Sequence, residues 1–248
     1  YNTFSARGKY IAILSGDDCW TDPSKLQKQI GFLESNSEYT LSFHDSNSID
    51  ADGNELPQPM PPERNKRDLS SSDLMKGKFI PALSCTYRNI FQSIPDSVTK
   101  CLGEDRFSQV LVGEKGKGVY QSNILPAAYR RHKEGIYSGM PRPHRLKIQL
   151  NNLSKIKKYF VIKNKRIHDY YKIKCIRTKE WIFFSHIGNF QYDMAYKVWL
   201  EVVKGYVRNG RVRRALSFIV GSIRFIVGHL RRQLRLFPTR DIIDKAQS

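Results

Sequence analysis

The chain has 248 residues, 40% of them apolar and 26% charged, which is long enough and ordinary enough for one or two globular domains with a real core. Its four cysteines, at positions 19, 85, 101 and 175, have neither paired nor metal-ligand spacing, which excludes a disulfide framework and a zinc site and fits a reducing cytosol. The net charge of +19 implies a polyanionic neighbour, either nucleic acid or the anionic face of a membrane.

This positive charge is confined to one part of the chain. Residues 1–140 contain 17 Lys/Arg and 17 Asp/Glu, whereas residues 141–248 contain 25 Lys/Arg and only 6 Asp/Glu. The change of composition coincides with Pro141-Arg142-Pro143. We therefore predict two domains, a neutral globular segment over residues 1–140 and a basic region over residues 141–248.

The first candidate site follows a short apolar run. Residues 10–14 are rich in strand formers and lack a helical period, which predicts a strand buried on both faces, as in a parallel sheet. A turn at Ser15-Gly16 then leads to two adjacent carboxylates, Asp17 and Asp18. In open α/β sheets ligands bind beyond the carboxyl ends of strands, and such carboxylates suit a hard divalent cation. An ordinary acidic turn is the alternative.

The residues around this pair resemble a known family. The segments that carry the resemblance are Ala6–Ala12, Gly16–Pro23, Lys25–Gln29 and Phe32–Glu34, and they are similar to inverting family 2 glycosyltransferases. The resemblance implies an α/β, Rossmann-like GT-A sheet, in which the aspartate pair holds a divalent metal, Mg or Mn, and the nucleotide-diphosphate sugar. Asp17 and Asp18 are then metal ligands, and Asp17 also contacts the donor. Many members have an acidic residue where this chain has Ser15.

The same resemblance bears on how much of the domain is present. Family members carry further strands and the pocket for the nucleotide base ahead of the aspartate pair, and the chain begins with Tyr rather than Met. We therefore expect the chain to be the back portion of a GT-A catalytic domain.

Downstream patterns predict alternating elements. Leu26, Ile30 and Leu33 form one apolar stripe of a helix that begins near Thr21-Asp22-Pro23. A strand is expected over residues 39–44, with a hairpin-type turn at residues 52–54 and a surface loop over residues 57–68. Further along, the patterns predict a capped helix at 70–76, a strand and turn within 79–91, and a strand at 119–125.

A second acidic pair, Glu104-Asp105, precedes an apolar helical pattern. Carboxylates at a helix start are favoured by the helix dipole alone. The resemblance implies more, because family 2 enzymes place their catalytic base at the aspartate of such a pair. Asp105 is thus our candidate for the base that takes the proton of the acceptor hydroxyl, and Glu104 is the second catalytic candidate, suited to orienting the acceptor.

A basic segment at residues 128–136 supplies the remaining site candidates. Family members often carry Tyr-Arg-x-His-x-x-Gly here, on a loop that closes over the donor diphosphate, and Arg130 and His132 match this pattern. Charge-assisted hydrogen bonds suit such side chains to phosphate. A solvated basic surface is the alternative.

The region 141–248 reads as mainly helical, with helices expected within residues 145–180, 191–208 and 211–237. The last contains a nearly continuous apolar run interrupted by Arg224 and bracketed by other arginines. It is too short and too charged to span a bilayer. An interfacial helix on anionic lipid is one interpretation, and a helical hairpin packed on the catalytic domain is another.

Together these features predict a metal-assisted inverting glycosyltransferase that moves a sugar from a nucleotide-diphosphate donor to a carbohydrate or lipid-linked acceptor, in surface polysaccharide or glycolipid synthesis. We expect it in the cytoplasm, peripheral on the inner face of the cell membrane. The alternatives are a truncated, non-catalytic remnant and a basic peripheral-membrane or nucleic-acid-binding module. Nucleic acid is the weakest partner, because the chain carries no recognised fingerprint for it.

Overall fold

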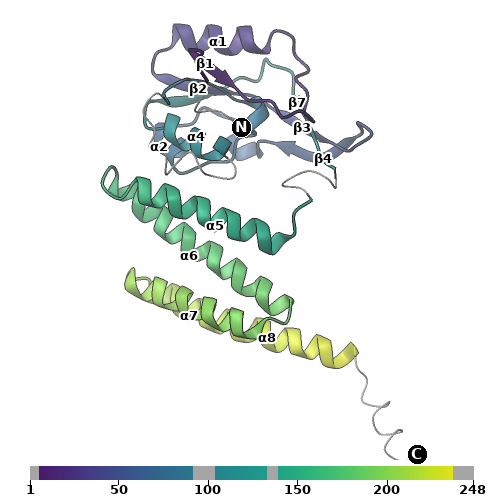
Figure 1. The fold of residues 1–248 in the computed structure, drawn as a ribbon, viewed down its shortest axis with the longest axis vertical. Coiled ribbons are helices and arrows are strands. Elements are labelled where there is room, and N and C mark those ends of the chain that lie inside the picture. Colours follow the sequence, from purple (N-terminus) through teal and green to yellow (C-terminus); the bar gives the residue numbers. More distant parts are fainter. Residues whose placement is uncertain (1–5, 92–103, 133–138, 237–248) are drawn as a thin grey trace, which may run out of the picture. The chain divides into compact units, whose positions relative to one another are not determined.

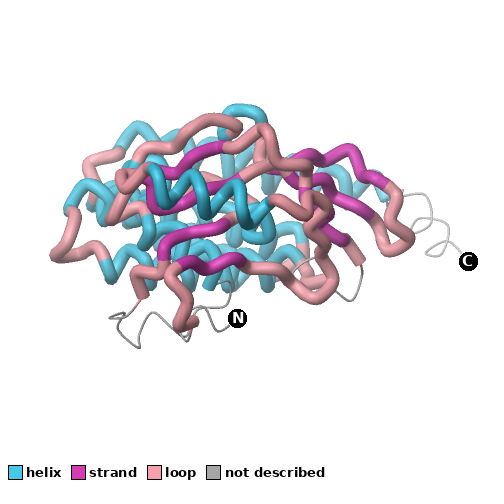
Figure 2. Tube along the Cα trace, turned by 90° about the horizontal axis from the view of Figure 1, so that it is seen from above, coloured by secondary structure: helices cyan, strands magenta, loops and turns pink. Residues whose placement is uncertain are grey.

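The computed structural model describes residues 6–91, 104–132 and 139–236 and shows a mixed α/β fold with a helical C-terminal region. The chain forms two compact units (Figure 1). Unit 1 comprises Tyr1–Met140 together with Asn151–Tyr171, and unit 2 comprises Pro141–Leu150 together with Lys172–Ser248. Every strand among the described residues belongs to unit 1, and Figure 2 shows the strands in magenta as two groups.

The first sheet of unit 1 has four strands in the order β1 (Tyr10–Ala12), β5 (Thr86–Arg88), β2 (Tyr39–Phe43) and β6 (Lys117–Tyr120). β5 is antiparallel to both of its neighbours, and β2 is parallel to β6. The predicted strand at 39–44 is confirmed. The strand predicted at 119–125 lies slightly earlier, and only three residues of the 79–91 segment are a strand, preceded by a 3-10 turn at Ala82–Ser84.

The environment predicted for residues 10–14 was wrong. Within the described residues β1 is a short edge strand whose one partner, β5, is antiparallel. Its side chains alternate, since Ile11 and Ile13 are buried while Leu14 is exposed. An apolar run of this length looks the same whether it is covered on both faces or on one, so the sequence could not separate the two cases.

The second sheet has three strands, in the order β4 (Glu55–Met60), β3 (Ser46–Ile49) and β7 (Ala127–Arg130). The predicted turn joins β3 to β4, where the Asp50 carboxylate accepts hydrogen bonds from the backbone N–H groups of Asp52 and Asn54 and Gly53 has a positive φ. The loop predicted at 57–68 was partly wrong, because β4 runs to Met60. β3 and β7 are parallel, with Ser46 opposite Ala127.

Three helices complete the described α/β part: α1 (Lys25–Ser35), α2 (Ser71–Met75) and α4 (Glu104–Val112). All three confirm predicted helices. α2 begins with a capping box between Ser70 and Asp73 and ends before Gly77, which has a positive φ. At the end of α4, Gly113 approaches Leu74 and Met75 so closely that a Cβ would clash with their backbone, so only glycine fits there.

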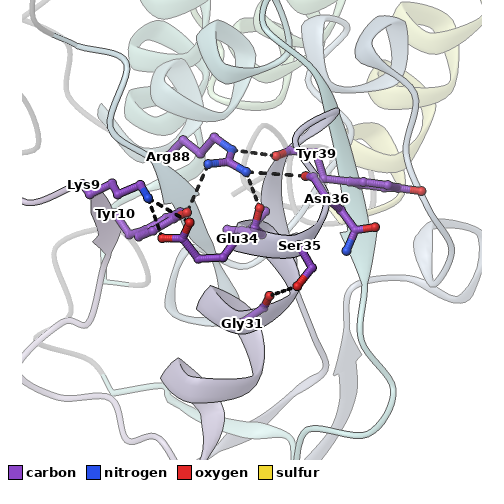
Figure 3. A network of polar contacts seen from close by, with 9 residues as sticks. Lys9, Tyr10, Gly31, Glu34, Ser35, Asn36, Tyr39 and Arg88 are labelled. Carbon is purple, nitrogen blue, oxygen red and sulfur yellow. Dashed lines mark hydrogen bonds and ion pairs between the residues drawn. The ribbon is translucent and has the colours of Figure 1, made fainter.

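Helix α1 is attached to the first sheet by its C-terminal end (Figure 3). The Arg88 guanidinium on β5 donates to the carbonyl oxygens of Leu33 and Asn36, and also to the Tyr39 carbonyl at 3.0 Å and the Tyr10 hydroxyl at 3.1 Å. A cation at a helix C-terminus satisfies carbonyls that have no intrahelical partner. One arginine thus joins α1 to β1, β5 and β2.

The face of α1 that is buried differs from the predicted one. Lys25, Gln29 and Leu33 are its buried residues, whereas Leu26 of the expected stripe is 37% exposed. The Gln29 amide donates to the Ser84 carbonyl at 2.9 Å, and its oxygen accepts from Thr86 at 2.6 Å and from the Lys25 amine at 2.7 Å. Because Ser84 and Thr86 supply hydrogen-bond partners for the Gln29 amide, polar side chains can occupy the face of α1 that packs against the sheet.

The helical region consists of α5 (Arg142–Tyr159), α6 (Lys165–Gly188), α7 (Tyr192–Arg208) and α8 (Val212–Leu236), and α5 and α6 each pass through both units. The predicted helices at 191–208 and 211–237 are confirmed. α7 and α8 pack side by side in unit 2 (Figure 1), where the Trp199 indole donates to the Ser222 hydroxyl at 3.0 Å. The core of unit 2 contains Ile176, Phe183 and Ile187 of α6, Ala195, Val202 and Tyr206 of α7, and Ala215 and Phe218 of α8.

Candidate active site

The predicted aspartate pair lies in a turn just after β1. The backbone N–H of Asp18 donates to the Ser15 carbonyl at 3.2 Å, which closes the turn. The next residue, Cys19, pairs with Ala128 of β7 through two backbone hydrogen bonds of 3.0 and 2.8 Å. Although β1 and β7 belong to different sheets, this bridge joins the turn to the second sheet.

Further hydrogen bonds join the same two segments on both sides of the Cys19–Ala128 bridge. The Asp18 carboxylate accepts from the backbone N–H of Arg130 at 3.0 Å, and the Thr21 hydroxyl donates to the Pro126 carbonyl at 2.8 Å. The Asp22 carboxylate accepts from the Leu125 N–H at 3.2 Å. Residues 17–22 and 125–132 are therefore paired almost residue by residue. The two motifs that the sequence analysis singled out, more than a hundred positions apart, form one structural unit.

Arg130 and His132 both contact Asp17, but in different ways. The His132 ring Nε2 lies 3.1 Å from a carboxylate oxygen of Asp17. The Arg130 side chain instead donates to three backbone carbonyls, those of Asp17 at 3.2 Å, Asp50 at 3.1 Å and Ala51 at 2.9 Å. Arg130 thus fixes the aspartate turn against the β3–β4 turn, and phosphate binding by either side chain stays a prediction.

The carboxylates offer a reasonable environment for a cation. Burial, and to a lesser extent the neighbouring Asp17, raises the pKa of Asp18 to about 6 although the Arg130 N–H opposes this shift. A cation beside such a half-buried carboxylate would stabilise its charged form. The described ranges hold no group of three or more His, Cys, Asp or Glu side chains suited to a metal. A cation at Asp17 and Asp18 would therefore need further oxygens, such as those of a diphosphate.

The second acidic pair begins α4. Asp105 lies in the first turn of the helix, and burial raises its pKa. Glu104 is the first residue of the helix, but its side chain lies outside the described residues. A raised pKa keeps a carboxylate basic enough to take a proton, which is the property that a general base requires.

Tyr129 of β7 connects the two acidic spots. Burial raises the pKa of its hydroxyl, and the negative charges of Asp18, Asp17 and Asp105 raise it further, against the opposing charge of Arg131. All three carboxylates therefore lie within electrostatic reach of one phenol. No role was predicted for Tyr129 from the sequence, and its place as the first residue of the matched Tyr-Arg-x-His pattern is the signal that could have indicated one.

Behind the aspartate turn lies a buried polar cluster that sequence reasoning also missed. Lys25 is 1% exposed, its amine lies 4.3 Å from the centre of the Trp20 ring, and burial lowers its pKa to about 8. Burial and the nearby Lys25 charge lower the pKa of His44, at the end of β2, to about 4. Trp20 itself donates to the Leu83 carbonyl at 2.8 Å. The Trp20 hydrogen bond holds the residues after the aspartate pair against Leu83, in the segment 79–91.

Asp22 connects this cluster to helix α1. Its carboxylate accepts from the backbone N–H and hydroxyl of Ser24, at 2.8 and 2.6 Å, and forms an ion pair with Lys28 at 2.9 Å. The Ser24 and Lys28 hydrogen bonds hold the pKa of Asp22 far below its ordinary value. Asp22 therefore stays ionised and holds Ser24, the residue before α1, so the helix begins at Lys25, slightly later than predicted.

Comparison with known proteins gives distant relatives. No protein-family model matches the chain. The chain is 36% identical over 135 residues to an uncharacterized protein of Mycobacterium tuberculosis and to one of Mycobacterium bovis, a match that covers 54% of this chain and 38% of each relative. It is 30% identical over 111 residues to an uncharacterized glycosyltransferase of Methanocaldococcus jannaschii, covering 40% of this chain and 38% of that protein. The chain therefore spans well under half the length of these relatives.

Proposed function

We propose that the chain forms the back portion of a GT-A catalytic domain that transfers a sugar, with inversion, from a nucleotide-diphosphate donor to a carbohydrate or lipid-linked hydroxyl. The observation that supports the proposal is that the charges of Asp17, Asp18 and Asp105, from both acidic spots, all help to raise the pKa of the Tyr129 hydroxyl. A donor held at one acidic spot then has a potential base at the other. The distant similarity to a glycosyltransferase supports the same class of reaction.

In this reaction the acceptor oxygen attacks the anomeric carbon of the donor sugar and forms the new glycosidic bond. Asp105 takes the proton of the acceptor hydroxyl, and the bond between the anomeric carbon and the diphosphate breaks, with both electrons leaving on the phosphate oxygen. One displacement inverts the configuration. The raised pKa of Asp105 favours proton uptake at this step.

Asp17 and Asp18 would hold a divalent cation, Mg or Mn, through carboxylate oxygens that are not used by His132 and the Arg130 N–H. Such a cation, when bound, offsets the charge that develops on the departing diphosphate. The chain's own residues keep the two carboxylates in position, since Arg130 clamps the turn and His132 orients Asp17.

The decisive experiment screens nucleotide-sugar donors with the full-length protein and Mg or Mn, and measures the nucleoside diphosphate released. We expect Asp105→Asn to lower turnover by roughly 10²- to 10⁴-fold while donor binding is retained, because only the proton transfer is lost. Asp193→Asn, the same chemical change at an exposed position on α7, is the matched control and should behave as the wild type.

Two results would contradict the assignment. Wild-type turnover in the Asp105→Asn protein would exclude Asp105 as the base. Failure of every donor to bind the wild-type protein, measured by calorimetry with metal present, would favour the non-catalytic alternative.

A further inference from the structure

The outer face of α8 in unit 2 is apolar and is not covered by any described residue. Six aliphatic side chains recur there at spacings of three and four, and each is more than two-fifths exposed: Val212, Leu216, Val220, Ile223, Val227 and Leu230. We call these six residues the α8 stripe. Residues three and four apart share one side of an α-helix, so the stripe is continuous along α8.

The stripe is separate from the face by which α8 packs in unit 2. That inner face consists of Ala215, Phe218, Ser222 and His229, which are buried, together with the partly buried Phe225. Phe218 packs edge-on against Phe183, and Phe225 against Phe184, both on α6. α8 thus has two apolar faces, one of which packs in the core of unit 2 while the other is exposed at the surface.

Arginines follow one edge of the stripe. Arg213, Arg224 and Arg231 are exposed and recur at intervals of eleven and seven residues, which return to the same side of a helix. α8 carries six arginines and no acidic residue, within a region of 25 Lys/Arg and 6 Asp/Glu. The charged side chains along this edge of the stripe are therefore all cationic.

We propose that the α8 stripe is a docking surface for an anionic membrane, on which α8 lies in the plane of the interface. Aliphatic side chains would enter the boundary between headgroups and acyl chains, and the arginine edge would contact anionic headgroups. No helix in the part of the chain that the structure describes combines the length and the apolar character needed to cross a bilayer. The proposal is independent of the glycosyl-transfer function, because it uses residues of unit 2 alone.

Charge and side-chain type favour this occupant over two others. A second copy would bring another basic helix with six arginines to the same surface, where like charges repel. Nucleic-acid surfaces bind bases by stacking on aromatic side chains, whereas the stripe is entirely aliphatic. An anionic lipid surface complements both the aliphatic stripe and its cationic edge.

The test is flotation of the full chain with two kinds of vesicle, phosphatidylcholine alone and phosphatidylcholine mixed with phosphatidylglycerol. We expect the wild type to float with the mixed vesicles only, and less completely as salt is raised. The variant V220S/I223S/V227S should bind the mixed vesicles at least ~10-fold more weakly, because three aliphatic side chains no longer enter the interface. Circular dichroism of each variant checks that its helix content is retained.

A second variant tests the arginine edge without altering the stripe. R213Q/R224Q/R231Q should weaken binding to the mixed vesicles by more than ~10-fold and reduce its salt dependence, since each arginine near an anionic surface contributes about fivefold. The matched control R7Q/R64Q/R208Q removes the same charge from exposed positions outside α8, and its binding to the mixed vesicles should weaken far less. For the stripe variant, the control is Ile162→Ser, at a position that is 91% exposed and far along the sequence from α8.

Several results would overturn the proposal. One is a wild type that stays unbound with the mixed vesicles, and another is a stripe variant that floats as well as the wild type. A dimer in light scattering that the stripe variant abolishes, without vesicle binding, would assign the stripe to a second copy. Binding of single-stranded RNA without vesicle binding would assign it to nucleic acid.

Discussion

Helices α1 and α8 use their apolar residues in opposite ways. α1 buries Lys25 and Gln29 against the sheet and leaves Leu26 at the surface, whereas α8 leaves Leu216 and five further branched aliphatic residues at least as exposed as Leu26. The difference lies in what each helix meets. α1 meets hydrogen-bonding groups of Ser84 and Thr86, while α8 meets aromatic rings of α6 on one face and, among the described residues, nothing on the other. Burial follows the partner surface rather than the hydropathy of the helix alone.

The largest effect is expected at the inner face of α8. Phe218→Ala should lower the stability of unit 2 by about 3 to 5 kcal/mol, because a ring packed against Phe183 and Phe184 is replaced by a cavity. Hydrogen exchange of α7 and α8 peptides measures the loss. Exchange rates equal to those of the wild type would show that this face is not the packed one.

A slightly smaller effect is expected at the polar inner face of α1. Gln29→Leu should lower the stability of unit 1 by about 3 kcal/mol, since Ser84, Thr86 and Lys25 all lose their buried partner. The matched control is Leu26→Ala, which should cost less than about 1 kcal/mol because Leu26 is at the surface. Hydrogen exchange of α1 peptides reads both variants. A larger loss of stability for Leu26→Ala than for Gln29→Leu would show that the predicted apolar stripe is the buried face of α1.

The third prediction concerns pH. The pKa of Lys25 falls from 10.5 to about 8 on folding, so between these pH values the unfolded chain binds more protons than the folded one. The Lys25 contribution to stability should therefore rise by roughly 2 kcal/mol as the pH rises from about 8 to 10.5. Urea denaturation followed by Trp fluorescence measures it, as the difference between the wild type and Lys25→Met.

Lys115→Met, at an exposed position, is the control for the loss of a lysine as such. If the difference between the wild type and Lys25→Met does not change over this pH window, the Lys25 amine is not held in the buried cluster.

The smallest effect is expected on the outer face of α8. Leu216→Ser should change the stability of unit 2 by no more than about 0.5 kcal/mol, since the side chain is 57% exposed. The same hydrogen-exchange measurement as for Phe218→Ala provides the comparison. A loss comparable to that of Phe218→Ala would mean that Leu216 is covered in solution.

Local sequence signals predicted the elements well where they depend on neighbouring residues. Ser70 and Asp73 predicted a cap and form one, and the apolar periods at 104–112, 192–208 and 212–236 correspond to helices. The sequence failed where a partner far along the chain decides the outcome. β1 pairs antiparallel with β5, and β4 occupies part of a predicted loop, because strand pairing depends on contacts that no local window contains.

The candidate site shows the same division. The resemblance singled out Asp17, Asp18, Asp105, Arg130 and His132, and their assigned roles remain predictions. Only the folded chain shows that the Arg130 side chain donates to three backbone carbonyls, and that the charges of three carboxylates help to raise the pKa of Tyr129. These relations depend on the pairing of residues 17–22 with residues 125–132, which neither segment encodes alone.

By itself, the sequence determined that residues 211–237 contain a helix with a nearly continuous apolar run, interrupted by Arg224 and bracketed by other arginines, because helical period and charge are local properties. It likewise determined that two carboxylates follow the first strand. The tertiary structure decided which apolar side of α8 is buried, which side chains of α1 face the sheet, and which segments pair around Asp17 and Asp18. Those outcomes depend on the surfaces that each element meets, and hydrogen-bonding partners and aromatic rings from distant segments form these surfaces only once the chain has folded.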